Sequence, residues 1–90
     1  MENQSGEWLP VGSVVEVAGA EEPLRIFGYL AQDVRSGAVH DYLGYPHPSG
    51  MASSDEAFLF DRGDIVRLRF VGYQNGVWDE LAQALAARRD

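Results

Sequence analysis

Ninety residues suit a single domain, and fourteen Asp and Glu residues against seven Arg give a formal net charge of −7. Such an acidic chain repels phosphate backbones, so nucleic acid is not an expected partner. The chain has no cysteine, no run of 18 apolar residues, and neither a basic nor an apolar stretch in its first seven residues. We therefore expect no disulfide or thiolate site, no membrane span and no signal peptide, which predicts a soluble cytoplasmic protein.

Short apolar runs separated by turn residues predict a sheet after a flexible segment at residues 1–8, in which Trp8 covers the core. The predicted strands cover residues 13–18, 24–32, 39–45, 57–60 and 65–71. Before the last strand, Asp61-Arg62-Gly63-Asp64 is predicted to form one helical turn capped by Asp61.

Alternation within the strands predicts which side chains face the core. The last strand alternates most regularly, which predicts core positions at Val66, Leu68 and Phe70, with Arg67 and Arg69 facing solvent. In the second strand the same rule places Phe27 and Tyr29 together on the face opposite Ile26 and Leu30.

The C-terminal residues 77–89 have the pattern of a helix. One apolar stripe recurs at helical spacing, formed by Val77, Trp78, Leu81, Ala84 and Leu85. A helix of about 13 residues is marginal alone in water, so the stripe is expected to pack on its own sheet or on a partner. The expected fold is therefore α+β. It is a small, strongly bent antiparallel sheet or a partly open five-stranded barrel with a C-terminal helix, in one domain at residues 9–90.

A search for catalytic and metal-binding patterns finds little support. His40, Asp41 and His47 suggest a metal site, but a strand turns His40 and Asp41 to opposite sides and a proline corner separates His47. Two histidines without a third firm ligand make a poor zinc site. The serines lack a nucleophile motif, and the glycines lie singly rather than in a phosphate-binding run. We predict no metal, no cofactor and no enzymatic activity.

The ring-rich segment 41–50 (DYLGYPHPSG) predicts a binding surface, because exposed aromatic rings beside a proline-stiffened corner are typical of contact surfaces. We expect a protein-binding surface formed by Tyr42, Tyr45, His47, Pro48 and, from the helix, Trp78. An acidic rim is expected to steer a basic helical partner, through Asp41, Asp55 and Glu56. The alternative is that both sheet faces are covered and the rings belong to the core.

Five segments in one order carry a resemblance to a known family: residues 9–15 (LPVGSVV), 26–29 (IFGY), 41–44 (DYLG) with Pro48 and Gly50, Phe60 with Asp64 and Ile65, and 70–73 (FVGY). Over residues 9–73 the chain resembles the domain-of-unknown-function family 4176. It departs from the family at Tyr29, where arginine is usual, at Ser49, where glutamate is usual, and at Asp61, where asparagine is usual. Roles of that arginine and glutamate do not carry over.

Members of that family are small bacterial proteins typically encoded beside LXG-type polymorphic toxins of the type VII secretion system. The resemblance implies a non-enzymatic accessory, an adaptor or chaperone-like protein that binds a toxin or its helical targeting region in the cytoplasm. One alternative is an immunity or inhibitor protein that caps the toxin's active site. Another is a small-ligand-binding barrel with a pocket lined by Tyr42, Tyr45 and His47. The sequence does not indicate the oligomeric state.

Overall fold

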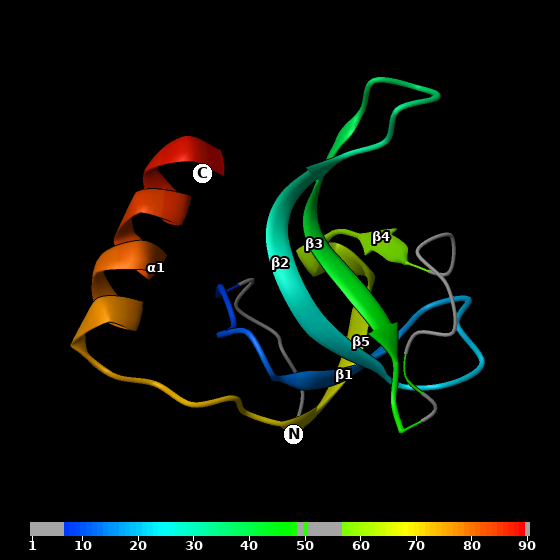
Figure 1. Ribbon diagram of the computed structural model, residues 1–90, viewed down its shortest axis with the longest axis horizontal. Helices are drawn as coiled ribbons and strands as arrows, with labels where there is room; N and C mark the ends of the chain where they lie inside the picture. The colour runs from blue at the N-terminus through cyan, green and yellow to red at the C-terminus, as the bar shows by residue number, and fades with distance from the viewer. Residues whose placement is uncertain (1–6, 49, 51–56, 90) are drawn as a thin grey trace.

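The computed structural model describes residues 7–48, 50 and 57–89, and it confirms the α+β class (Figure 1). Five antiparallel strands form one sheet in the order β4-β3-β2-β1-β5, with β4 and β5 at its two ends. The strands are β1 (Val14–Val17), β2 (Leu24–Gln32), β3 (Val39–Pro46), β4 (Phe58–Phe60) and β5 (Ile65–Phe70). The predicted helical turn is confirmed as the short 3-10 helix Arg62–Asp64, and α1 (Gly76–Arg89) ends the chain.

The core lies between one face of the sheet and α1. Its buried members come from every part of the chain: Trp8, Leu9, Val15, Val17, Leu24, Ile26, Tyr42, Phe60, Ile65, Leu68 and Leu85. Figure 1 shows the N-terminal segment (blue) running between α1 and the strands. Segments from both ends of the chain therefore close the same core.

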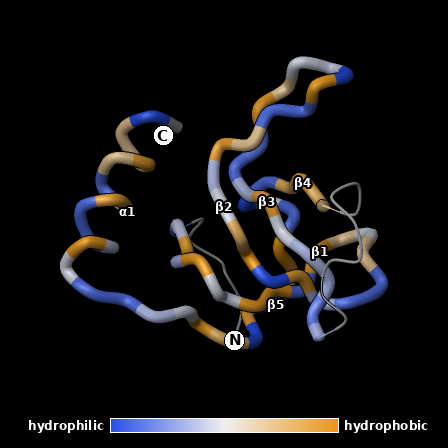
Figure 2. Tube along the Cα trace, viewed as in Figure 1, coloured by the Kyte–Doolittle hydropathy of each residue, from blue (hydrophilic) through white to orange (hydrophobic). Residues whose placement is uncertain are grey.

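α1 packs on its own sheet, but through a different stripe from the predicted one. The Trp78 ring stacks on Tyr29 at a centroid distance of 6.0 Å, and Leu85 is buried in the core. Val77 and Leu81 instead face outward, with Val77 70% exposed. Figure 2 shows apolar residues recurring along successive turns of α1. The predicted stripe mixed two faces of the helix.

Within the described part of the chain, no helix is long and apolar enough to cross a membrane.

Two bulges in β5 overturn the expected alternation of its side chains. Val15 pairs with Leu68 while Val14 pairs with Phe70, so Arg69 is an extra residue opposite β1. A second shift occurs between Glu16 and Val17 and makes Val66 the extra residue on β5. Each extra residue reverses the faces to which the later side chains of the strand point. The core therefore receives Ile65 and Leu68, whereas Val66 and Phe70, predicted to be core, are 54% and 61% exposed.

A third bulge, in β2, separates two rings that were expected on one face. Ile26 pairs with Gly44 and Gly28 with Leu43, which leaves Phe27 as the extra residue. After this bulge Tyr29 pairs with Tyr42 on the core side, while Phe27 stays on the opposite face. The expectation that Phe27 and Tyr29 share a face is therefore wrong. Because bulges bend and twist their strand, these three irregularities suit a strongly bent sheet.

Two tyrosine hydroxyls hold the N-terminal segment on the core. The Leu9 amide donates to Tyr42 Oη at 2.9 Å, and Tyr29 Oη donates to the Leu9 carbonyl at 2.6 Å. Trp8 packs edge-on against both tyrosine rings, at centroid distances of 6.1 and 5.5 Å. Trp8 thus covers the core as expected. The first six residues of the expected flexible segment 1–8 lie outside the described residues.

The connection after β5 requires a glycine. The Gly72 amide donates to Ser13 Oγ at 3.0 Å in a fully buried contact. A Cβ at position 72 would overlap the Val11 carbonyl oxygen and lie 2.9 Å from the Ser13 amide nitrogen. Only a residue without a side chain lets the two backbone segments approach this closely.

Candidate functional site

One row of side chains crosses four strands on the face of the sheet opposite the core. We call this row the outer row; its residues lie opposite one another in the order Tyr45 (β3), Arg25 (β2), Val14 (β1) and Phe70 (β5). Residues directly opposed in a sheet point to the same face. The next row, which includes Val15 and Leu24, points into the core. The outer row is therefore a second, separate packing surface.

The outer row lies in two adjoining hollows that we call together the outer groove. The first has a volume of about 660 Å³ and is lined by Val14, Arg25, His47, Pro48, Arg69 and Phe70, with Gly12 and Pro23. The second has a volume of about 490 Å³ and brings in Phe27 and Tyr45. Both hollows share Arg25, His47 and Pro48. Each is within the usual size range of ligand sites.

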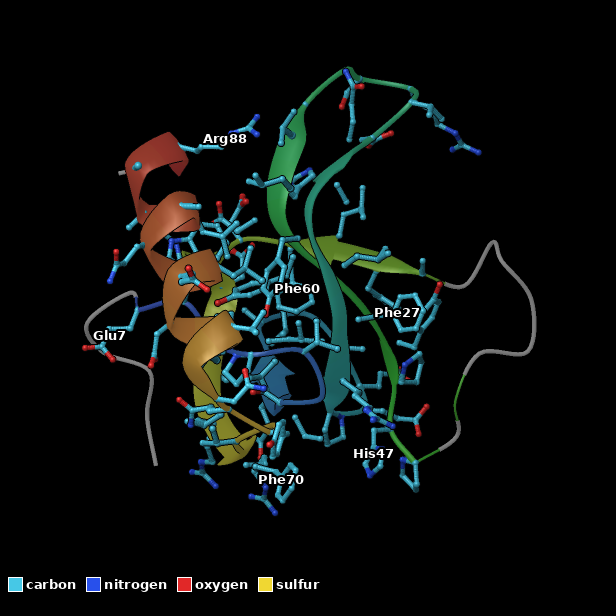
Figure 3. All side chains as sticks on the ribbon, turned by 60° about the vertical axis from the view of Figure 1, so that its left-hand side comes forward. Glu7, Phe27, His47, Phe60, Phe70 and Arg88 are labelled. Carbon is cyan, nitrogen blue, oxygen red and sulfur yellow. The ribbon has the colours of Figure 1, made fainter. Side chains whose placement is uncertain are left out.

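Aromatic rings stand at both ends of the outer groove. At one end Phe27 and Tyr45 meet edge-on, with ring centroids 5.0 Å apart. At the other end stands Phe70, and both phenylalanines are about 60% exposed. In Figure 3, Phe27 and His47 lie on the side of the sheet away from α1, whereas Phe60 points inward toward the helix. Val14, between the rings, is covered although it is not a member of the core cluster.

The bulges and the proline corner place these side chains. The bulge at Arg69 turns Phe70 outward. Arg25 pairs with Tyr45, and Phe27 lies two residues further along β2 on the same face, beside the Tyr45 ring. After β3 the backbone is anchored because the His47 amide donates to the Pro23 carbonyl at 2.9 Å. This bond brings the corner His47-Pro48 against the start of β2. The groove is therefore built on paired strands rather than on loose loops.

The outer groove is cationic in an acidic chain. Its lining contains Arg25, Arg69 and His47, and no Asp or Glu among the residues described. Arg69 is bound by Glu16 at 3.0 Å, with both side chains partly exposed. Arg25 forms no ion pair or side-chain hydrogen bond with the described residues, and it stands in the centre of the outer row. An arginine without an ion-pair partner in the described part of the chain can bind a carboxylate or another anion.

The structure separates the residues predicted as a protein-binding surface. Tyr45, His47 and Pro48 line the outer groove. Tyr42 is 0% exposed in the core and cannot reach a partner, and Trp78 packs on the other side of the sheet against Tyr29. The alternative of a small-ligand-binding barrel needs one pocket lined by Tyr42, Tyr45 and His47. These three side chains do not share a pocket, because Tyr42 points to the opposite face.

The expected acidic rim is also corrected. Asp41 is buried, and its carboxylate accepts from the Arg62 amide at 2.9 Å and from Arg62 Nε at 3.2 Å. The Arg62 guanidinium lies 4.4 Å from the centroid of the Trp8 ring, so this pair supports the core. Asp55 and Glu56 lie outside the described residues. Asp41 therefore does not steer a basic partner.

The histidines do not converge on a shared site. His40 Nδ1 is 3.3 Å from Asp61 Oδ2 near the start of β3, whereas His47 comes directly after the end of that strand. Among the residues that the structure describes, no group of three or more His, Asp or Glu side chains is arranged to hold a metal ion.

Arg25, Val14 and Phe70 were not predicted as site residues. Arg25 alternates with the core residues Leu24 and Ile26, so its outward direction was readable from the sequence. Its position beside Tyr45 and Val14 depended on the pairing of three strands, which no local pattern reveals.

Comparison with known proteins identifies a family for this chain. A family model described as "Domain of unknown function (DUF4176)" matches residues 8–80. No curated protein and no solved structure matches the chain.

Proposed function

Because the chain belongs to the DUF4176 family, we propose that it is a non-enzymatic, protein-binding accessory, an adaptor or chaperone-like protein that acts in the cytoplasm on a secreted toxin. The observation that carries this proposal is the outer groove. It exposes rings at both ends, Phe27 with Tyr45 and then Phe70, around Arg25, which forms no ion pair with the described residues. Rings and arginine are the side chains most enriched at protein contacts.

The placement of these rings on ordered backbone favours protein binding. Tyr45 and Phe70 stand on paired strands, and the corner after Tyr45 is held by the bond from His47 to Pro23. Side chains that are already ordered lose less entropy when a partner covers them. A phenylalanine that is about 60% exposed on each side of the groove also leaves apolar area for a partner to remove from water.

The identity of the partner is proposed from the resemblance of the sequence to its family. That resemblance implies an LXG-type toxin exported by type VII secretion, with its helical N-terminal targeting region as the part that is bound. An accessory bound there leaves the C-terminal toxic domain free. An inhibitor or immunity protein would instead bind the toxic domain.

The test is a binding experiment with the two halves of an LXG protein from the same genome. Each half is purified separately, mixed with this protein, and followed by size-exclusion chromatography and isothermal titration calorimetry. A complex with the N-terminal region alone supports the proposal. A complex with the C-terminal domain alone indicates an inhibitor, and binding to neither half refutes both roles.

Variants locate the contact surface in the same experiment. Tyr45→Ala removes a ring of the outer groove, and it should weaken the complex while changing the melting temperature little. The control is Val77→Ala, which shortens an exposed side chain on α1 and should leave binding unchanged. Equal affinity of Tyr45→Ala and the wild-type protein would place the surface elsewhere.

A further inference from the structure

We propose that the outer groove binds a partner segment in which one Asp or Glu is flanked by apolar or aromatic residues, with its carboxylate bound by Arg25. This inference rests on the proposed function, because it names the chemistry of the bound protein segment. It reverses the charge of the partner expected from the sequence, which was basic.

The chemical groups along the groove have a defined order. The outer row runs from Tyr45, with Phe27 against it, through Arg25 and the covered Val14 to Phe70. An apolar contact is therefore available at each end and a cation between them. A complementary segment has the order apolar, acidic, apolar.

The charge of the groove contrasts with that of the rest of the chain. The net charge of −7 gives most of the surface a field that repels anions. The described lining of the groove nevertheless holds two arginines and a histidine and no acid. Glu16 neutralises Arg69, but no described residue plays this part for Arg25. The planar guanidinium of Arg25 can take a carboxylate through two parallel hydrogen bonds.

The length of the outer row sets the size of the bound segment. Neighbouring strands lie about 4.8 Å apart, so the outer row spans roughly 14 Å from β3 to β5. About five extended residues, or about ten helical ones, cover that span. A library of 12-residue peptides therefore contains segments long enough to fill the groove in either conformation.

The probe is a random 12-residue peptide library displayed on phage and selected on the immobilised wild-type protein. We expect the selected peptides to share an Asp or Glu with apolar or aromatic residues on both sides. A synthetic peptide of that consensus should bind the wild-type protein, and Arg25→Gln should weaken it about tenfold or more, as loss of a charged hydrogen bond does.

Two further variants make the result specific. Arg88→Gln removes an exposed arginine on α1, remote from the groove in Figure 3, and should bind like the wild-type protein. Glu16→Gln releases Arg69 and should bind the acidic peptide more tightly by a small factor, such as two- to threefold. Melting curves should show that Arg25→Gln and Arg88→Gln both fold, since both side chains are exposed.

The inference is overturned if no peptides are enriched, if the consensus lacks an acid, or if Arg25→Gln and Arg88→Gln bind the acidic peptide equally. Its failure can be told apart from failure of the proposed function. An LXG region that binds while the library yields no acidic consensus refutes only the charge of the ligand. Acidic peptides that bind through Arg25 while both LXG halves fail to bind refute only the identity of the partner.

Discussion

Replacing Tyr42 by phenylalanine should destabilise the protein through a single hydrogen bond. The Tyr42 ring is fully buried, and its hydroxyl is the acceptor for the Leu9 amide at 2.9 Å. Phenylalanine keeps the aromatic ring, so the apolar packing of the core is almost unchanged and only the hydroxyl group is lost. The Leu9 amide, however, is left buried without that acceptor.

The size of the effect can be worked out from this geometry. A buried donor that loses its partner costs about 1–3 kcal/mol. For a domain of this size, each kcal/mol corresponds to a shift of about 4–8 °C in the melting temperature, so Tyr42→Phe should melt roughly 5–20 °C lower. Tyr29→Phe removes a donor to the Leu9 carbonyl from a partly buried position and should cost less, about 0.5–1.5 kcal/mol.

Urea unfolding followed by tryptophan fluorescence is a suitable assay, because Trp8 packs against the Tyr42 ring and reports on that region. The matched control is Tyr45→Phe, whose ring lies on the outer face and forms no hydrogen bond with the described residues. It should change the free energy of unfolding by less than about 0.5 kcal/mol. If Tyr42→Phe and Tyr45→Phe unfold at the same urea concentration, the hydrogen bond to Leu9 contributes nothing to stability and the prediction is refuted.

Burial raises the pKa of Tyr42 to about 12. The neutral Tyr42 hydroxyl therefore contributes fully to the stability of the folded state below pH 10, where tyrosine in the unfolded chain titrates, and this contribution is lost as the pH rises toward 12. The free energy of unfolding should therefore fall on the order of 2 kcal/mol between pH 9 and pH 12, and a flat profile would contradict this. Gly72→Ala should cost about 1–3 kcal/mol or more through backbone overlap, while Gly63→Ala, with open space around it, should be nearly neutral in the same urea assay. Asp41→Ala removes an acceptor from a buried ion pair and should cost about 3–5 kcal/mol, so a loss below 1 kcal/mol would show that the pair is dispensable. Phe70→Ala should lower the free energy of unfolding by less than about 1 kcal/mol, because the ring is 61% exposed. A loss of about 3 kcal/mol would show instead that the ring is buried in the core.

The fold was predictable from the sequence to the level of its elements. Five strands, the helical turn at Arg62–Asp64 and the C-terminal helix are indicated by apolar runs and turn residues, and the structure places them close to the expected bounds. The direction of individual side chains was less predictable. An extra residue at Phe27, Val66 or Arg69 reverses a face, yet each bulge is defined by the pairing of two strands and not by either strand alone.

The candidate site was predictable only in part for the same reason. The corner residues Tyr45, His47 and Pro48 stand out because rings and prolines are concentrated there, and they do line the groove. Tyr42 is equally conspicuous in the sequence, but it belongs to the core. Phe70 enters the site because the bulge at Arg69 turns it outward, so its role depended on tertiary structure.

The irregular backbone of β5 also bears on edge-to-edge association between copies of this protein. β5 is an end strand of an open sheet, and a flat end strand offers its backbone amides and carbonyls as a template for a strand of another molecule. Two bulges within six residues break the even spacing that such a template needs. The exposed arginines at 67 and 69 add charge that must be desolvated before a second strand approaches. The features that turn Phe70 toward the groove thereby also discourage edge-to-edge aggregation.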